Sequence, residues 1–79
     1  MSQNVLGKNI RRLRREAGFS RTAFAFMVGV SVQTVQWWET GRVLPKPENI
    51  ELILRVLNTR VRCTRDDLFA ETAPLTKAG

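Results

Sequence analysis

With 79 residues, of which 43% are hydrophobic, the chain has room for one small domain with a modest core. The net charge is +6, the single cysteine excludes an internal disulfide, and the lack of histidine removes zinc-finger ligation and the commonest general base. No apolar run approaches the roughly 18 residues of a membrane span, and the first residues are too polar for a signal peptide, so we expect a cytoplasmic protein with no membrane partner, enzymatic activity, metal or cofactor.

Residues 5–17 are predicted to form the first helix. An apolar stripe runs along one side of it at helical spacing, through Leu6, Ile10, Leu13 and Ala17. Gly18 supplies a C-terminal stop, and Phe19, directly before Ser20, is placed to act as an apolar staple for the next helix.

Residues 20–41 are predicted to form two short helices joined by a tight turn. Ser20 and Ser31 can each cap a helix start, because a serine hydroxyl accepts from the free N–H groups of the first turn. Gly29 suits the left-handed conformation that ends the earlier helix. Apolar side chains recur at helical spacing at Phe24, Ala25 and Val28, and at Val35 and Trp38. This pattern is typical of the helix-turn-helix of DNA-binding domains.

The predicted second helix, residues 21–28, has another apolar face made of Ala23, Phe26 and Met27. A small domain seldom exposes such side chains together. Two explanations remain open. Either the C-terminal tail or the loop between the fourth and fifth helices covers these residues, or they bind a protein partner.

The predicted third helix, residues 31–40, has two distinct faces. The side chains expected to turn inward are Val35, Trp38 and Glu39. The outward side chains are Val32, Gln33, Gln36 and Trp37, with Thr34 near the start of the helix. Gln matches an adenine edge in the major groove, and Val can meet a thymine methyl group.

The positive charge lies in the same half of the chain. Residues 1–46 hold eight basic side chains against two acidic ones, whereas from residue 47 onward there are five of each sign. A run of charge alone more often marks a solvated face. Because this one coincides with a helix-turn-helix, we predict that it neutralises DNA phosphates.

Pro47 is predicted to open a fourth helix that carries more apolar side chains than one buried face needs. Residues 58–63 form a connector whose alternating pattern also permits a short strand, and Thr64 then caps a fifth helix over residues 65–70. We predict that a homodimer forms through the fourth helix, the connector and the fifth helix, with contacts at Ile53, Leu57 and Val61.

The motifs follow one another in a characteristic order and spacing over residues 5–70: Leu6, Ile10, Leu13-Arg14, Gly18-Phe19-Ser20, Phe24-Ala25, Val28-Gly29-Val30-Ser31, Thr34-Val35, Trp38-Glu39-Thr40-Gly41 and Pro45. Together they resemble the lambda-repressor-like helix-turn-helix family, which includes phage repressors and Cro proteins. The resemblance implies a compact, all-α, five-helix DNA-binding domain over residues 1–70, whose third helix enters the major groove. Residues 71–79 would then be a flexible tail.

The resemblance also implies roles for individual residues. Arg14 would pair with Glu39 and tie the first helix to the third, rather than touch DNA. Bases would be read by Val32, Gln33, Gln36 and Trp37. Phosphates would be bound by Ser20, Arg21, Thr34, Arg42, Arg11 and Arg15. The chain departs from the family pattern at Arg21, Ala23 and Trp37, and in its longer connector.

These expectations combine into a sequence-specific transcriptional regulator: a repressor that binds a palindromic operator in double-stranded DNA as a homodimer. The alternative is an antitoxin-like protein-interaction module. It would use Phe26, Met27 and the fourth helix against a partner chain, with DNA binding secondary.

Overall fold

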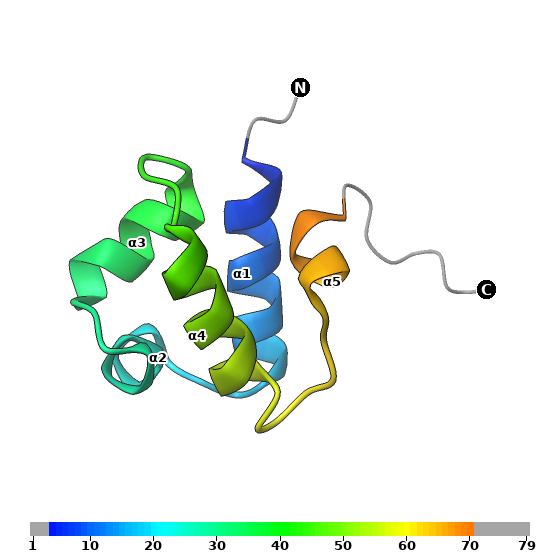
Figure 1. Ribbon diagram of the computed structural model, residues 1–79. Coiled ribbons are helices and arrows are strands. Elements are labelled where there is room, and N and C mark those ends of the chain that lie inside the picture. Colours follow the sequence, from blue (N-terminus) through cyan, green and yellow to red (C-terminus); the bar gives the residue numbers. More distant parts are fainter. Residues whose placement is uncertain (1–3, 71–79) are drawn as a thin grey trace.

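The computed structural model describes residues 4–70, which form five α-helices with no strand among them (Figure 1). The helices are α1 (Val5–Glu16), α2 (Arg21–Val28), α3 (Val32–Thr40), α4 (Pro47–Leu57) and α5 (Arg65–Phe69). The predicted all-α, five-helix fold is therefore confirmed. The expected flexible tail, residues 71–79, lies outside the described residues.

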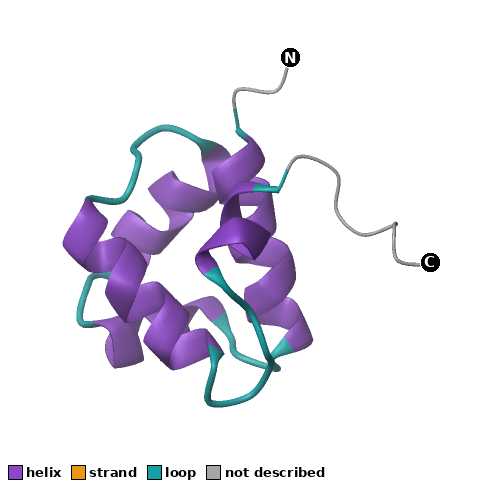
Figure 2. Ribbon diagram, turned by 45° about the vertical axis from the view of Figure 1, so that its right-hand side comes forward, coloured by secondary structure: helices purple, strands orange, loops and turns teal. Residues whose placement is uncertain are grey.

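The helices enclose one core. α1 packs against α3 and α5, while α2 packs against α3 and α4. Every helix contributes to the core, and its largest fully buried side chains are Phe24, Ile10, Ile53, Leu57, Leu68 and Val35. Figure 2 shows that the connector between α4 and α5 is a loop at the edge of the helical bundle.

The start of α2 is fixed by a cap and an apolar staple. The Ser20 hydroxyl accepts a hydrogen bond from the backbone N–H of Ala23 at 3.0 Å. Phe19, which precedes the cap, is buried with its ring centroid 6.2 Å from that of Phe24 in the first turns of α2. The guanidinium carbon of Arg60 lies 4.8 Å from the centroid of the Phe19 ring, in cation–π geometry. The staple predicted for Phe19 is present.

The turn between α2 and α3 depends on glycine. Gly29 has a φ of 94°, and its N–H and that of Val30 both donate to the carbonyl oxygen of Ala25, at 2.8 and 2.9 Å. A left-handed conformation costs about 1–2 kcal/mol for a residue with a Cβ. Two residues later, the Ser31 hydroxyl accepts from the N–H of Thr34 and starts α3. The sequence predicted both ends of this turn.

A second glycine brings two helix backbones together. A Cβ at Gly7 in α1 would collide with the carbonyl oxygens of Trp38 and Glu39 in α3. The neighbouring Asn4 side chain donates to the Glu39 carbonyl at 3.0 Å, satisfying an acceptor near the end of α3. Gly7 thus lets α1 approach α3 at backbone distance.

The short α5 is held by side chains from other parts of the chain. A five-residue helix is too short to be stable alone. Its start has the predicted capping box between Thr64 and Asp67. At its end, the buried Asn9 amide donates to the carbonyl oxygens of Leu68 and Ala70, both at 2.8 Å. Asn9 therefore ties α5 to α1.

The connector is a turn organised by Asn58, so the alternative of a short strand there is wrong. The Asn58 amide donates to the carbonyl oxygen of Cys63 at 2.8 Å, and its oxygen accepts from the N–H of Cys63 at 3.2 Å. Cys63 is buried. Burial, with a smaller contribution from the Asp67 carboxylate, raises the pKa of its thiol.

Candidate nucleic-acid interface

The two faces of α3 have opposite environments. Val35, Trp38 and Glu39 are buried against the other helices, as the sequence predicted. The opposite side presents four side chains to solvent, which we call the α3 outer face: Val32, Gln33, Gln36 and Trp37. The adjacent tryptophans show the division directly, because Trp38 is 2% exposed and Trp37 is 36% exposed.

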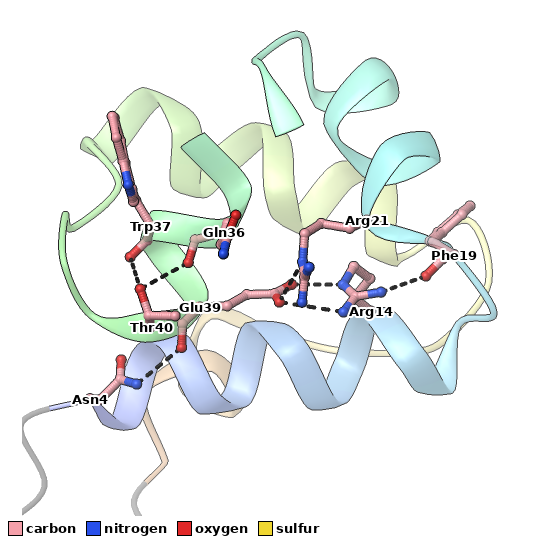
Figure 3. Close-up of polar contacts among 8 residues, drawn as sticks. All are labelled: Asn4, Arg14, Phe19, Arg21, Gln36, Trp37, Glu39 and Thr40. Atoms are coloured by element: carbon pink, nitrogen blue, oxygen red, sulfur yellow. Dashed lines mark hydrogen bonds and ion pairs between the residues drawn. The ribbon is translucent and has the colours of Figure 1, made fainter. Parts of the chain in front are cut away.

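Several hydroxyl groups on α3 are occupied by the helix itself. At the N-terminal end, Ser31 and Thr34 form the cap and share a side-chain hydrogen bond of 2.9 Å. At the other end, the Thr40 hydroxyl donates to the backbone carbonyls of Gln36 and Trp37 (Figure 3). The Gln33 and Gln36 amides, by contrast, form no hydrogen bond with any of residues 4–70 and remain available to a ligand.

Two arginines, Arg14 and Arg21, donate hydrogen bonds to the carboxylate of Glu39, and the three side chains form a charged cluster (Figure 3). Arg14 donates to its carboxylate from Nε at 2.7 Å and from Nη2 at 3.4 Å, and Arg21 donates from Nε at 3.2 Å. Arg14 also donates from Nη1 to the carbonyl oxygen of Phe19 at 2.9 Å. The Glu39 side chain is 2% exposed, so these bonds replace the water that a carboxylate requires. The cluster joins α1, the start of α2 and α3.

Arg21 has a contact that the sequence did not indicate. It was assigned to DNA phosphates, with Glu39 assigned to Arg14 alone. In the structure, the Arg21 Nε is held by Glu39 while the side chain remains 39% exposed. A guanidinium has five N–H donors, so the Nη groups remain for a second acceptor. The backbone N–H groups at the start of α2, next to Arg21, also favour an anion.

The remaining predicted phosphate-binding residues lie on three elements. The Ser20 and Thr34 hydroxyls take part in the caps of α2 and α3. Arg11 and Arg15 are exposed on α1, and Arg42 is exposed just after α3. An open surface hollow of about 520 Å³ is lined by Lys8, Arg11, Arg12, Arg15 and Glu16. The outward side of α1 therefore carries excess positive charge, only part of which is offset by the Arg12–Glu16 ion pair.

Phe26 and Met27 on α2 are 85% and 46% exposed. The explanation that the α4–α5 loop covers them is wrong, because this exposure is measured with that loop in place. The other cover considered, the tail at residues 71–79, lies outside the described residues.

The prediction that Ile53 and Leu57 lie in a dimer interface is wrong. Ile53 and Leu57 are each 0% exposed, because α4 turns them into the core of the same chain. They are not available to a second chain. Val61 is half-buried and packs against the edge of that core. The apolar surplus of α4 thus serves packing within the domain.

Two other properties bear on function. None of the helices in the described part of the chain is long and apolar enough to cross a membrane. Among residues 4–70, no three His, Cys, Asp or Glu side chains are grouped so that they could hold a metal ion.

The comparisons with known proteins agree with this geometry at the level of the family. A family described as "Helix-turn-helix domain" matches residues 5–68. No curated protein and no solved structure gives a match. Because the match covers most of the chain and all five helices start within it, the chain belongs to this helix-turn-helix family of DNA-binding domains.

Proposed function

We propose that this helix-turn-helix chain is a sequence-specific transcriptional repressor of the lambda-repressor-like type, which binds a palindromic operator as a homodimer. The observation that carries the proposal is the α3 outer face. It combines unengaged amides and exposed apolar groups with no charge of its own, and cationic side chains adjoin it at Arg21 and Arg42.

Such a surface separates the two tasks of an operator-binding protein. Phosphate contacts supply most of the affinity and fix the orientation, whereas contacts with base edges supply the specificity. An α-helix fits the major groove, which is about 12 Å wide. Arg21, Arg42 and the exposed arginines of α1 would then bind the phosphates on either side of α3.

Repression needs no catalytic step in this proposal, because a bound dimer blocks a promoter by occupying it. Two-fold dimers read half-sites that lie about 34–36 Å apart. In the proposed dimer the two α3 helices would lie on one side, one DNA turn apart. With Ile53 and Leu57 buried, the dimer contact would use the connector and α5, where Val61 and the exposed Phe69 lie.

Footprinting the purified full chain on the DNA that flanks its own gene tests this function. We expect a protected region with two half-sites related by a two-fold axis, and an affinity that falls steeply as salt is raised. Sedimentation with DNA of operator length should show two chains per duplex. The proposal would be contradicted if the chain stays monomeric on this DNA at tens of micromolar. It would also be contradicted if the affinity for DNA does not change with salt concentration.

The exposed pair Phe26 and Met27 favours a second candidate, a protein-interaction module. Its complex with an apolar partner should be nearly insensitive to salt, unlike a DNA complex. The Phe26→Ser variant separates the two functions, because it removes the apolar contact and leaves the α3 outer face intact. If this variant loses regulation in cells while its footprint is unchanged, the interaction module is the main function.

A further inference from the structure

We infer that the α3 outer face selects half-sites built of A·T base pairs. Gln33 and Gln36 bind adenine edges, and Val32 and Trp37 pack against thymine methyl groups. The inference rests on the proposed function, since it names the class of DNA sequence that this face takes. It is based on two observations: the Gln amides of α3 form no hydrogen bond within the described chain, whereas Glu39 and the threonine hydroxyls of α3 are engaged within it.

The outer face of α3 carries no charged side chain. Guanine is best bound in the major groove by Arg or Lys, and the amino group of cytosine by Asp or Glu. The one charged residue of α3 is Glu39, which is buried and held by Arg14 and Arg21. The outer face therefore has no group of the kind that selects a G·C pair.

The two amides of the outer face, on Gln33 and Gln36, match the edge of adenine. Adenine presents an acceptor at N7 and a donor at N6, and the side chain of Gln matches both at once. Gln33 and Gln36 are three residues apart, so they project from the same side of α3. Neither amide is engaged by the rest of the described chain, whereas the nearby hydroxyls of Thr34 and Thr40 are. The amides are thus the polar groups that α3 offers to bases.

Apolar side chains, Val32 and Trp37, lie beside those amides on the outer face. In the major groove, the thymine methyl group is the apolar partner that a base pair presents. Trp37 extends away from α1 on the same side of α3 as Gln36 (Figure 3). Its backbone is fixed, because its carbonyl oxygen accepts from the N–H groups of Arg42 and Val43 at 2.9 and 3.3 Å. The indole has only two rotatable side-chain bonds, so it loses less conformational entropy on contact with a methyl group than a long flexible side chain does.

Arginines near α3 are the strongest competing source of specificity. The Arg21 guanidinium is held at Nε by Glu39, which fixes its position at the start of α2. Arg42 follows Gly41, the left-handed residue that ends α3, and so lies outside the helical register. We therefore assign both arginines to phosphates. A guanine in the half-site would be the sign that one of them reads a base.

The experiment has two arms and uses the full chain. In the first, a pool of randomised duplex DNA is selected for binding at fixed salt, and the half-site is read from the bound fraction. In the second, each thymine of the selected site is replaced in turn by deoxyuridine, which keeps pairing but lacks the methyl group. We expect an A·T half-site and a loss of about fourfold in affinity for each contacted methyl group, the value of one buried CH₂ group.

Two variants assign the methyl contact to a residue. With Trp37→Ala, the thymine next to Trp37 should become indistinguishable from deoxyuridine, while the other positions keep their sensitivity. Val43→Ala is the matched control, since Val43 is an exposed apolar residue on the loop after α3 rather than on the outer face. It should leave every thymine effect unchanged.

The outcomes separate this inference from the proposed function. A selected half-site rich in G·C pairs, or equal affinity for thymine and deoxyuridine at all positions, overturns the inference and leaves sequence-specific DNA binding standing. A chain that selects no sequence from the pool, even at low salt, overturns the proposed function itself. Because the deoxyuridine substitution is made in the DNA, misfolding of a variant cannot produce either result.

Discussion

The inner and outer faces of α3 use similar side chains for different purposes. Each face has a valine and a tryptophan, and Trp37 and Trp38 are neighbours in sequence. The inner side chains close the core, whereas the outer ones meet solvent and are proposed to meet DNA. Position around the helix, rather than residue type, decides between stability and recognition. The two properties should therefore respond to different substitutions.

The largest effect is expected for Trp38→Ala. Removing a buried tryptophan should lower the free energy of unfolding by about 3–5 kcal/mol, because of lost burial and the cavity left behind. This is a large part of the roughly 5–15 kcal/mol that stabilises a small domain. Urea unfolding followed by circular dichroism measures it. The control is Trp37→Ala, for which we expect a smaller loss, because Trp37 keeps about a third of its surface in solvent and its removal leaves no enclosed cavity. If both variants unfolded at the same urea concentration, the inner face of α3 would contribute no more to stability than the outer face.

Glu39→Ala should have the next largest effect on stability. It leaves the buried Arg14 guanidinium without its carboxylate, which costs about 3–5 kcal/mol when a buried pair is broken. Arg21→Ala is the matched control, because Arg21 is partly exposed and Glu39 keeps both of its hydrogen bonds from Arg14, so we expect a smaller loss of stability. Thermal melts of both variants compare them. A Glu39→Ala variant that melts like the native chain would show that the cluster does not stabilise the fold.

Gln33→Ala tests the outer face. We expect unfolding to be unchanged, while binding to the selected site loses about 1–3 kcal/mol of discrimination against random DNA. Fluorescence anisotropy with both duplexes at one salt concentration measures the ratio of affinities. An equal loss on the two duplexes would exclude Gln33 as a base-reading residue.

The smallest expected effects are those of replacing Arg21 and Arg42, the arginines beside the outer face, on the affinity for DNA. Arg21→Ala and Arg42→Ala should each weaken binding to selected and random DNA alike, and flatten the dependence of log K on log salt by about one unit. Arg55→Ala, at an exposed position of α4, is the control and should leave the slope unchanged. A slope that stays constant in both test variants would refute their assignment to phosphates.

Features that depend on local sequence were predictable. The caps at Ser20 and Ser31, the glycine turn and the phase of α3 each follow from residues within one or two turns of one another. Contacts between distant segments were not, because no local pattern marks them. Gly7 is one example, since its need for a small residue arises only where α1 meets the end of α3. Asn9 is another, because its amide donates to carbonyl oxygens in α5 and just after it.

The candidate site also has features that were predictable from local sequence and features that were not. The composition of the outer face could be read from helical spacing, but the sharing of Glu39 between Arg14 and Arg21 could not. The burial of Ile53 and Leu57 was misread for a related reason. An apolar surplus on a helix indicates that something covers it, but not whether that cover is the same chain or a second one.

Cys63 gives the chain a built-in reporter of local opening. It is the single thiol in the sequence, and it is buried where Asn58 closes the connector. Because its side chain is buried, the folded thiol is shielded from a reagent in solution, and the same burial raises its pKa. A thiol reagent should therefore modify the protein only through molecules in which the connector has opened. The labelling rate, compared with that of the unfolded chain, gives the free energy of this opening separately from global unfolding.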